Sequence, residues 1–197
     1  DGFVSRGLGD VYKRQFITVF LIFTLISTYE ANSLYQKIKS KGYKYNHPFI
    51  PPLYVLVSMI ALIYIPFSGN AIYNPYLILF IFILIWISDT MSYFFGSLFG
   101  RNNLKIEASP NKTWEGFFGG LFCSVLFSYV SFNFIQEIFP FWKTIVLGFI
   151  IPIFGLFGDI VQSKIKRKAG VKDSGNIIPG HGGLFDRLDS AIGNSFI

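Results

Sequence analysis

Long runs of uncharged, mostly apolar residues constrain the fold of this chain more than any other feature. In chain order they cover residues 16–29, 49–67, 74–100 with a single acid at position 89, 116–136 and 144–158. A helix needs about 20 apolar residues to cross the hydrocarbon core of a bilayer. Only 14% of the residues are charged, compared with about 25% in soluble domains. The sequence therefore predicts an all-α polytopic integral membrane protein with about five transmembrane helices.

The basic residues of the chain, whose net charge is +6, concentrate in alternate loops. Of the 17 lysines and arginines, 13 follow the first, third and last apolar runs, and the intervening loops 68–73 and 137–143 carry one. Cytoplasmic loops of membrane proteins are enriched in Lys and Arg. We therefore expect the three basic loops, and a polar site built from them, to face the cytoplasm. Charge that flanks membrane spans favours the lipid bilayer and soluble phosphates as partners over nucleic acid.

The two ends of the chain depart from this pattern. Residues 1–15 place basic side chains on the side opposite to the other basic loops, and we expect them to be a non-native leader. We expect residues 16–197 to form a single transmembrane domain. Residues 194–197 resemble the start of another apolar helix, so we expect that domain to be truncated at its C-terminus.

The segment 158–167 continues the last apolar run and is predicted to be helical. At helical spacing one face carries an acid, an amide, a hydroxyl and two cations: Asp159, Gln162, Ser163, Lys166 and Arg167. A carboxylate beside apolar residues is costly unless it meets a cation. That cation is either a bound metal or one of the chain's own basic side chains. In the second case the ion pair would only stabilise the end of the helix.

The segment 176–189 contains a glycine-rich turn that leads into a short helix. Gly182 and Gly183 let backbone N–H groups approach a ligand closely, and His181 can donate a hydrogen bond to phosphate. Such a turn before a helix is suited to binding anions, although it lacks the P-loop pattern. Asp186 and Asp189 lie near the start of the helix, where acids are also favourable on dipole grounds alone.

Together these two segments suit a metal-bound polyphosphate. Asp159 and Asp186 can converge on one divalent cation, and Mg²⁺ typically binds one or two carboxylates together with phosphate oxygens and water. The neighbouring basic residues can neutralise the rest of a triphosphate. Because phosphoryl and nucleotidyl transfer depend on positioning and charge stabilisation, we predict a Mg²⁺ site at Asp159 and Asp186.

A third polar region surrounds the end of the run that contains Asp89. An intramembrane acid is a functional candidate, although it can also hydrogen-bond a neighbouring helix. The turn 109–112 presents Lys112, and Thr113 is suited to cap the next helix. Glu115 either belongs to the site or is only an acid in the first turn of that helix.

The stretch from Ser163 to Asp189 resembles the signature of phosphatidate cytidylyltransferases, also called CDP-diacylglycerol synthases. That signature is Ser-x-hydrophobic-Lys-Arg, four residues, Lys-Asp-x-Gly-x-x-hydrophobic-Pro-x-His-Gly-Gly-hydrophobic-x-Asp-Arg-hydrophobic-Asp, and every fixed position is matched. The segments 88–90, 99–100 and 109–116 are also similar to the family. Position 162 is Gln where relatives often carry Glu.

The resemblance implies transfer of the CMP moiety of CTP to phosphatidate, which gives CDP-diacylglycerol and pyrophosphate for phospholipid biosynthesis in a bacterial inner membrane. It implies Mg²⁺, suggests a second, monovalent cation such as K⁺, and leaves a homodimer open. The catalytic residues that it implies are Asp159, Asp186, Lys166, Arg167 and Asp189. The implied substrate-binding residues are Ser163, Lys172, His181, Gly182, Gly183, Arg187, Lys112, Asp89 and Glu115.

Other interpretations of the sequence stay open. A CTP-dependent lipid-alcohol kinase would use a similar nucleotide site but would release CDP instead of pyrophosphate. A membrane transporter would place Asp89 and Asp159 on its pathway, although the charged cluster lies in a loop and not in paired broken helices at the middle of the membrane. The chain could also be an inactive fragment of the enzyme.

Overall fold

A computed structural model describes residues 2–42, 50–67, 73–137, 139–177 and 182–195, with side chains from residue 10 onward. Its elements in chain order are α1 (Gly2–Ser40), α2 (Ile50–Tyr64), η1 (Ile65–Phe67), α3 (Pro75–Phe99), α4 (Trp114–Ile135), α5 (Phe141–Ala169), α6 (Leu184–Arg187) and α7 (Asp189–Asn194). Within these residues the chain forms helices and no β-strand, apart from one isolated bridge between Asn103 and Thr113. The all-α prediction is confirmed.

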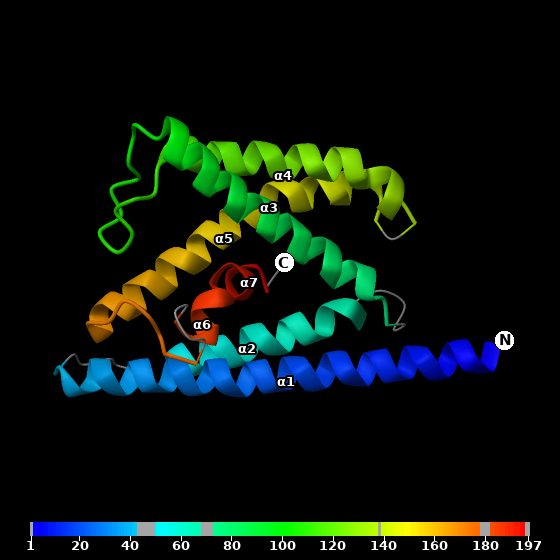
Figure 1. Cartoon of the computed structure of the whole chain (residues 1–197), viewed down its shortest axis with the longest axis horizontal. Helices are drawn as coiled ribbons and strands as arrows, with labels where there is room; N and C mark the ends of the chain where they lie inside the picture. The colour runs from blue at the N-terminus through cyan, green and yellow to red at the C-terminus, as the bar shows by residue number, and fades with distance from the viewer. Residues whose placement is uncertain (1, 43–49, 68–72, 138, 178–181, 196–197) are drawn as a thin grey trace.

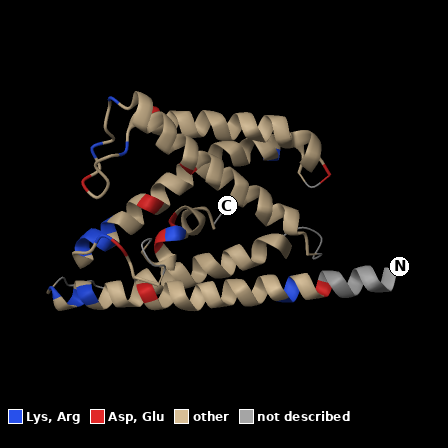
Figure 2. Cartoon of the chain, viewed as in Figure 1, with Lys and Arg blue, Asp and Glu red and all other residues tan. Residues whose placement is uncertain are grey.

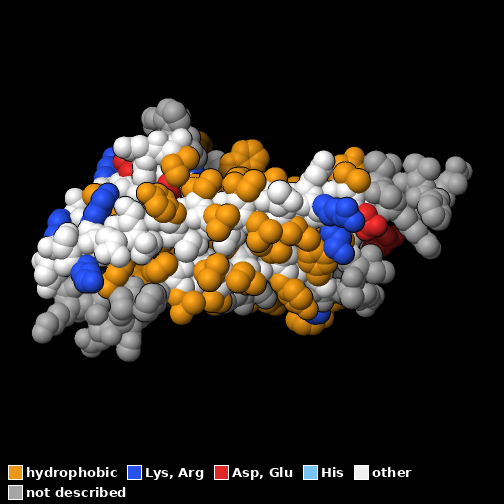
Figure 3. All heavy atoms as spheres, turned by 90° about the horizontal axis from the view of Figure 1, so that it is seen from below, with side chains coloured by type: hydrophobic (Ala, Val, Ile, Leu, Met, Phe, Trp, Pro, Cys, Tyr) orange, Lys and Arg blue, Asp and Glu red, His pale blue; other side chains and the backbone are white. Residues whose placement is uncertain are grey.

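The apolar runs fold into helices that could cross a membrane. Four described helices are long and apolar enough: Asp10–Ser40, Pro75–Phe99, Trp114–Ile135 and Phe141–Ala169. The run 49–67 forms a shorter apolar helix over Pro51–Phe67. Hydrophobic side chains cover the middle of the surface seen in Figure 3, and Lys and Arg lie toward its two ends. The prediction of a polytopic membrane protein is confirmed, with four long helices and one shorter one.

The helices form two groups that the C-terminal segment connects. In Figure 1, α1 and α2 lie side by side, while α3, α4 and α5 form the second group. The short helix α6 packs on α1, whereas α7 packs on α5, α2 and α3. The segment with the glycine-rich turn therefore ends between the two groups.

The three basic loops lie at one end of the molecule. Figure 2 shows Lys and Arg gathered at the C-terminal ends of α1 and α5 and in the loop between α3 and α4. This arrangement follows from the up-and-down course of the helices, because each return to that end is followed by a basic loop. The basic loops of the sequence therefore lie at one end of the structure, and the loops between them lie at the other end.

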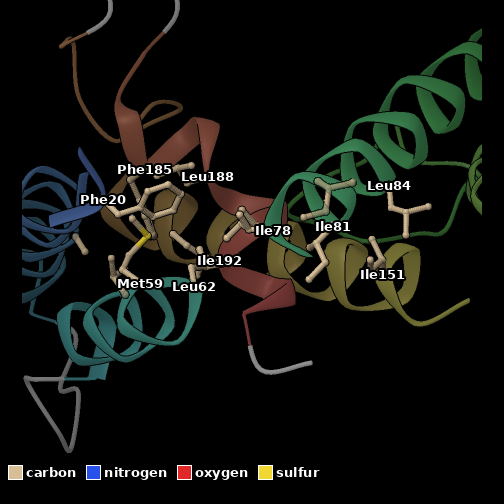
Figure 4. Packing of buried hydrophobic residues seen from close by; sticks show 14 of the residues in the cluster. Phe20, Met59, Leu62, Ile78, Ile81, Leu84, Ile151, Phe185, Leu188 and Ile192 are labelled. Carbon is tan, nitrogen blue, oxygen red and sulfur yellow. The ribbon is translucent and has the colours of Figure 1, made fainter. Parts of the chain in front are cut away.

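The α6–α7 segment is held in place by apolar side chains. Phe185, Leu188 and Ile192 are buried, and Figure 4 shows them among side chains that include Met59 and Leu62 of α2. Phe185 and Ile192 are 0% exposed. Since burying a large apolar side chain stabilises a protein by about 1.5–3 kcal/mol, these residues fix the segment that carries the polar site.

Helices α5 and α7 approach each other closely at two glycines. A Cβ atom at Gly158 would lie 2.7 Å from the Cα atom of Gly193 and 2.8 Å from the carbonyl oxygen of Asp189. Both atoms belong to the backbone, so neither can move without shifting α7. The absence of a side chain at Gly158 thus sets the distance between the two helices.

We predict that Gly158→Ala destabilises the protein, because the methyl group would force the two helices apart. Overpacking of this kind costs about 1–3 kcal/mol, and the gain in helix propensity of about 1 kcal/mol offsets only part of it. Thermal unfolding in detergent should show a lower midpoint. Gly155→Ala is the matched control, because its Cβ would meet the side-chain Nδ2 of Asn194 at 3.3 Å, which can move. Equal midpoints for both variants would contradict the prediction.

Candidate active site

A pocket of about 540 Å³ lies among α3, α4, α5 and α7. Three acids line it, Asp89 from α3, Asp159 from α5 and Asp189 from α7, together with Lys112 from the α3–α4 loop. Ser88, Ser92 and Thr113 supply hydroxyl groups. The fold therefore brings into one cavity residues from three polar regions that are far apart in the sequence.

Lys112 and Asp159 form an ion pair across this pocket. The Ser163 hydroxyl donates a hydrogen bond to Asp159 Oδ1 at 3.1 Å, so these two residues share a face of α5 as their spacing predicted. The loop that presents Lys112 is held by Glu115, whose carboxylate accepts hydrogen bonds from the backbone and side-chain nitrogens of Asn102. Thr113 caps α4 by accepting a hydrogen bond from the Gly116 N–H at 3.2 Å.

Asp189 lines the same pocket as Asp159 and Asp89. Burial raises the pKa of its carboxyl group to about 7, and the nearby charges of Asp159 and Asp89 act in the same direction, against a backbone hydrogen bond from Ser190. An acid whose pKa rises for these reasons is in an environment that favours a bound proton or cation. Asp189 is therefore the acid of the pocket that most readily keeps a proton near neutral pH.

Asp186 lies in a different hydrogen-bonding environment from Asp159. Its Oδ1 accepts from Lys166 Nζ at 2.8 Å, while its Oδ2 accepts from the Ser174 backbone at 2.7 Å, the Ser174 hydroxyl at 2.9 Å and the Gly183 backbone at 3.0 Å. Partial burial alone would raise the pKa of Asp186, but the bonds from Lys166, Ser174 and Gly183 hold it below its usual value. Asp186 is therefore ionised and oriented by its neighbours.

Glu30 lies on α1 and is 2% exposed, and it was not among the site residues predicted from the sequence. Its carboxylate accepts hydrogen bonds from the Ser174 hydroxyl and from the backbone N–H groups of Leu184 and Phe185. A signal was available, because Glu30 directly follows an uncharged run within a helix long enough to span a membrane. An ionisable residue at such a place is a functional candidate.

The other predicted site residues lie near this cluster or outside the described residues. Lys166 contacts Asp186, while Arg167, Lys172 and Arg187 are exposed. Gly182 has φ +84°, a conformation that favours glycine, and Gly183 donates to Asp186. His181 lies outside the described residues. Within the residues that are described, no three His, Cys, Asp or Glu side chains are grouped so that they could hold a metal ion by themselves.

These features define a class of protein: a polytopic membrane protein with an acidic pocket next to basic loops at one end of its helices. The sequence model of the cytidylyltransferase family matches residues 3–196, and the chain belongs to this family.

Two curated relatives carry a more specific name. The chain is 48% identical over 113 residues to a phosphatidate cytidylyltransferase of Staphylococcus epidermidis, which is 57% of this chain and 44% of that protein. It is 46% identical over 113 residues to a phosphatidate cytidylyltransferase of Staphylococcus aureus strain COL, with the same coverage. The matched region thus spans less than half the length of these relatives.

The raised pKa of Asp189 predicts a pH dependence of stability. Between pH 3.8 and about 7 the folded state retains a proton that the unfolded state has released, so the contribution of Asp189 to the free energy of unfolding falls as pH rises through this window. Asp189→Asn should remove this decline. Unfolding midpoints in detergent from pH 4.5 to 7.5 measure it, with the exposed acid variant Glu107→Gln as the control. A decline in Asp189→Asn as steep as in the wild type would contradict the prediction.

Proposed function

We propose that this chain transfers the CMP moiety of CTP to phosphatidate, which gives CDP-diacylglycerol and pyrophosphate. The observation that carries the proposal is that two residues of the signature segment lie beside Asp159. Ser163 donates a hydrogen bond to Asp159, and Asp189 lines the same pocket as Asp159. Membership in the cytidylyltransferase family and the names of the two staphylococcal relatives support the same reaction.

The chemistry requires charge stabilisation more than a strong base. A phosphate oxygen of phosphatidate attacks the α-phosphorus of CTP, the bond from that phosphorus to the bridging oxygen breaks, and pyrophosphate leaves with its electron pair. The lipid phosphate is already an anion at neutral pH, so the site needs to position two anionic reactants and offset their charge. Lys112 is paired with Asp159, and Lys166 is paired with Asp186. We propose that Arg167, Lys172 and Arg187 contact the phosphates.

We propose that Mg²⁺ is held by Asp159 and Asp186, because carboxylate oxygens are ligands that Mg²⁺ prefers. Each of these carboxylates is paired with a lysine ammonium group, and a third acid, Asp189, lines the same pocket as Asp159. Bound Mg²⁺ would neutralise charge on the phosphates of CTP. Lys112 and Lys166 would then be released from the carboxylates and could donate to phosphate oxygens, so that charge stays balanced. We propose that a second, monovalent cation such as K⁺ also binds at this site.

The position of the site suits a water-soluble and a lipid substrate. The pocket is lined both by α3 and α5, which are long enough to span a membrane, and by the basic α3–α4 loop at one end of the molecule. CTP would reach it from the cytoplasm, and phosphatidate would arrive from the bilayer. We propose that the basic end faces the cytoplasm of a bacterial cell, because Lys and Arg gather there.

We predict that Asp159→Asn and Asp186→Asn each reduce product formation at least about 100-fold, because each removes a charge that must balance a cation beside the phosphates. The assay measures CDP-diacylglycerol by mass spectrometry in membranes that contain the chain, CTP, phosphatidate and Mg²⁺. Glu107→Gln is the matched control, since Glu107 is an exposed acid that does not line the pocket. Activity retained in both aspartate variants would remove these residues from the site.

The same assay separates the competing functions. Pyrophosphate as the nucleotide product supports the cytidylyltransferase, whereas CDP together with a phosphorylated lipid alcohol would show a CTP-dependent kinase. A transporter would consume no CTP. Absence of any product from inserted wild-type chain would overturn the proposal for this chain.

A further inference from the structure

Glu30 joins the first helix to the signature segment, although 144 residues of sequence separate it from Ser174. Its Oε2 accepts from the Phe185 N–H at 2.8 Å and from the Ser174 hydroxyl at 3.0 Å, and its Oε1 accepts from the Leu184 N–H at 3.2 Å. Three donors from two parts of the segment thus converge on one buried carboxylate. Hydrogen bonds to a carboxylate are stronger than those between neutral groups.

The donors of Glu30 also position Asp186. The Ser174 hydroxyl lies 3.0 Å from Glu30 and 2.9 Å from Asp186 Oδ2, so its one proton can be donated to either acid. The Ser174 backbone N–H donates to the same oxygen of Asp186 at 2.7 Å. On the other side, Gly183 donates to Asp186 and directly precedes Leu184, which donates to Glu30. A displacement of Glu30 would therefore move the two backbone N–H groups that donate to Asp186, those of Ser174 and Gly183.

Two glycines of the signature segment lie close against the Glu30 carboxylate. A Cβ atom at Gly183 would lie 2.5 Å from either carboxylate oxygen, and one at Gly175 would lie 2.6 Å from Oε1. Both glycines let the backbone of the segment close around the acid. A helix that only needed to be buried against α6 would be served by an apolar side chain at position 30, at less cost than a carboxylate 2% exposed.

We infer that Glu30 is a positioning residue, which fixes Ser174 and the backbone at 183–185 so that Asp186 is oriented toward the metal-bound triphosphate. This inference rests on the proposed function, since it assigns Asp186 to that site. Glu30 does not touch substrate and acts through Ser174 and Gly183. Groups that orient a metal ligand in this way typically contribute about 10- to 100-fold to metal affinity or activity.

The test compares Glu30→Gln with wild type and with Glu107→Gln, all as the full chain in membranes. We expect Glu30→Gln to lower kcat/KM for CTP about 10- to 100-fold and to raise the Mg²⁺ concentration needed for half-maximal rate, while KM for phosphatidate stays within about twofold of wild type. Combining Glu30→Gln with Ser174→Ala should reduce activity by less than the product of the two single effects, because both act on Asp186. Unchanged CTP and Mg²⁺ dependence would overturn the inference.

A second measurement does not depend on turnover. Lys172 is exposed next to the segment that Glu30 holds, so trypsin should cleave after it faster in Glu30→Gln than in wild type or Glu107→Gln. Mg²⁺ with CTP should slow this cleavage in wild type and fail to do so in Glu30→Gln.

Equal cleavage in all three proteins would overturn the inference even if no product formed. Faster cleavage with normal protection by CTP would show a purely structural role and would also overturn it. Wild type that neither turns over nor is protected would refute the proposed function instead, and the cleavage rates without nucleotide would still decide whether Glu30 holds the segment.

Discussion

The close approach of α5 and α7 at Gly158 and Gly193 is the constraint on which the site depends. With no side chain between them, the two backbones come within a distance that any Cβ atom at Gly158 would prevent. Asp189 at the start of α7 is thereby placed in the same pocket as Asp159 of α5. Because α7 also packs on α2 and α3, the contact fixes one end of a segment that reaches across to α1.

This arrangement creates an electrostatic problem that the chain resolves in three ways. Asp159 and Asp186 are paired with lysines. Glu30 accepts hydrogen bonds from N–H and hydroxyl donors. Burial raises the pKa of Asp189 to about 7, so this carboxyl group keeps a proton up to about neutral pH. Acids in an apolar bundle are unfavourable unless they are paired or protonated. Each acid named here is therefore stabilised by an ion pair, by hydrogen bonds or by a bound proton.

The membrane setting gives these contacts more weight than they would have at a water-exposed surface. The Lys166 and Asp186 side chains are only 14% and 10% exposed, so solvent screens their attraction less than that of a surface pair. The basic loops stay at one end of the helices (Figure 2). This combination of an apolar wall and a cationic end suits the proposed reaction between a lipid phosphate and a soluble triphosphate.

The sequence alone determined the helical membrane class, the alternation of the loops and the residues of the signature segment. These follow from local composition and spacing, because a run of apolar residues must form hydrogen-bonded helix wherever it meets lipid. The pairing of Ser163 with Asp159 likewise follows from helical spacing. The tertiary structure alone decided that Lys112 meets Asp159, that Lys166 meets Asp186, and that Glu30 holds the segment from another helix. Such contacts join residues far apart along the chain, and they depend on how helices pack at small residues such as Gly158, which no local pattern encodes.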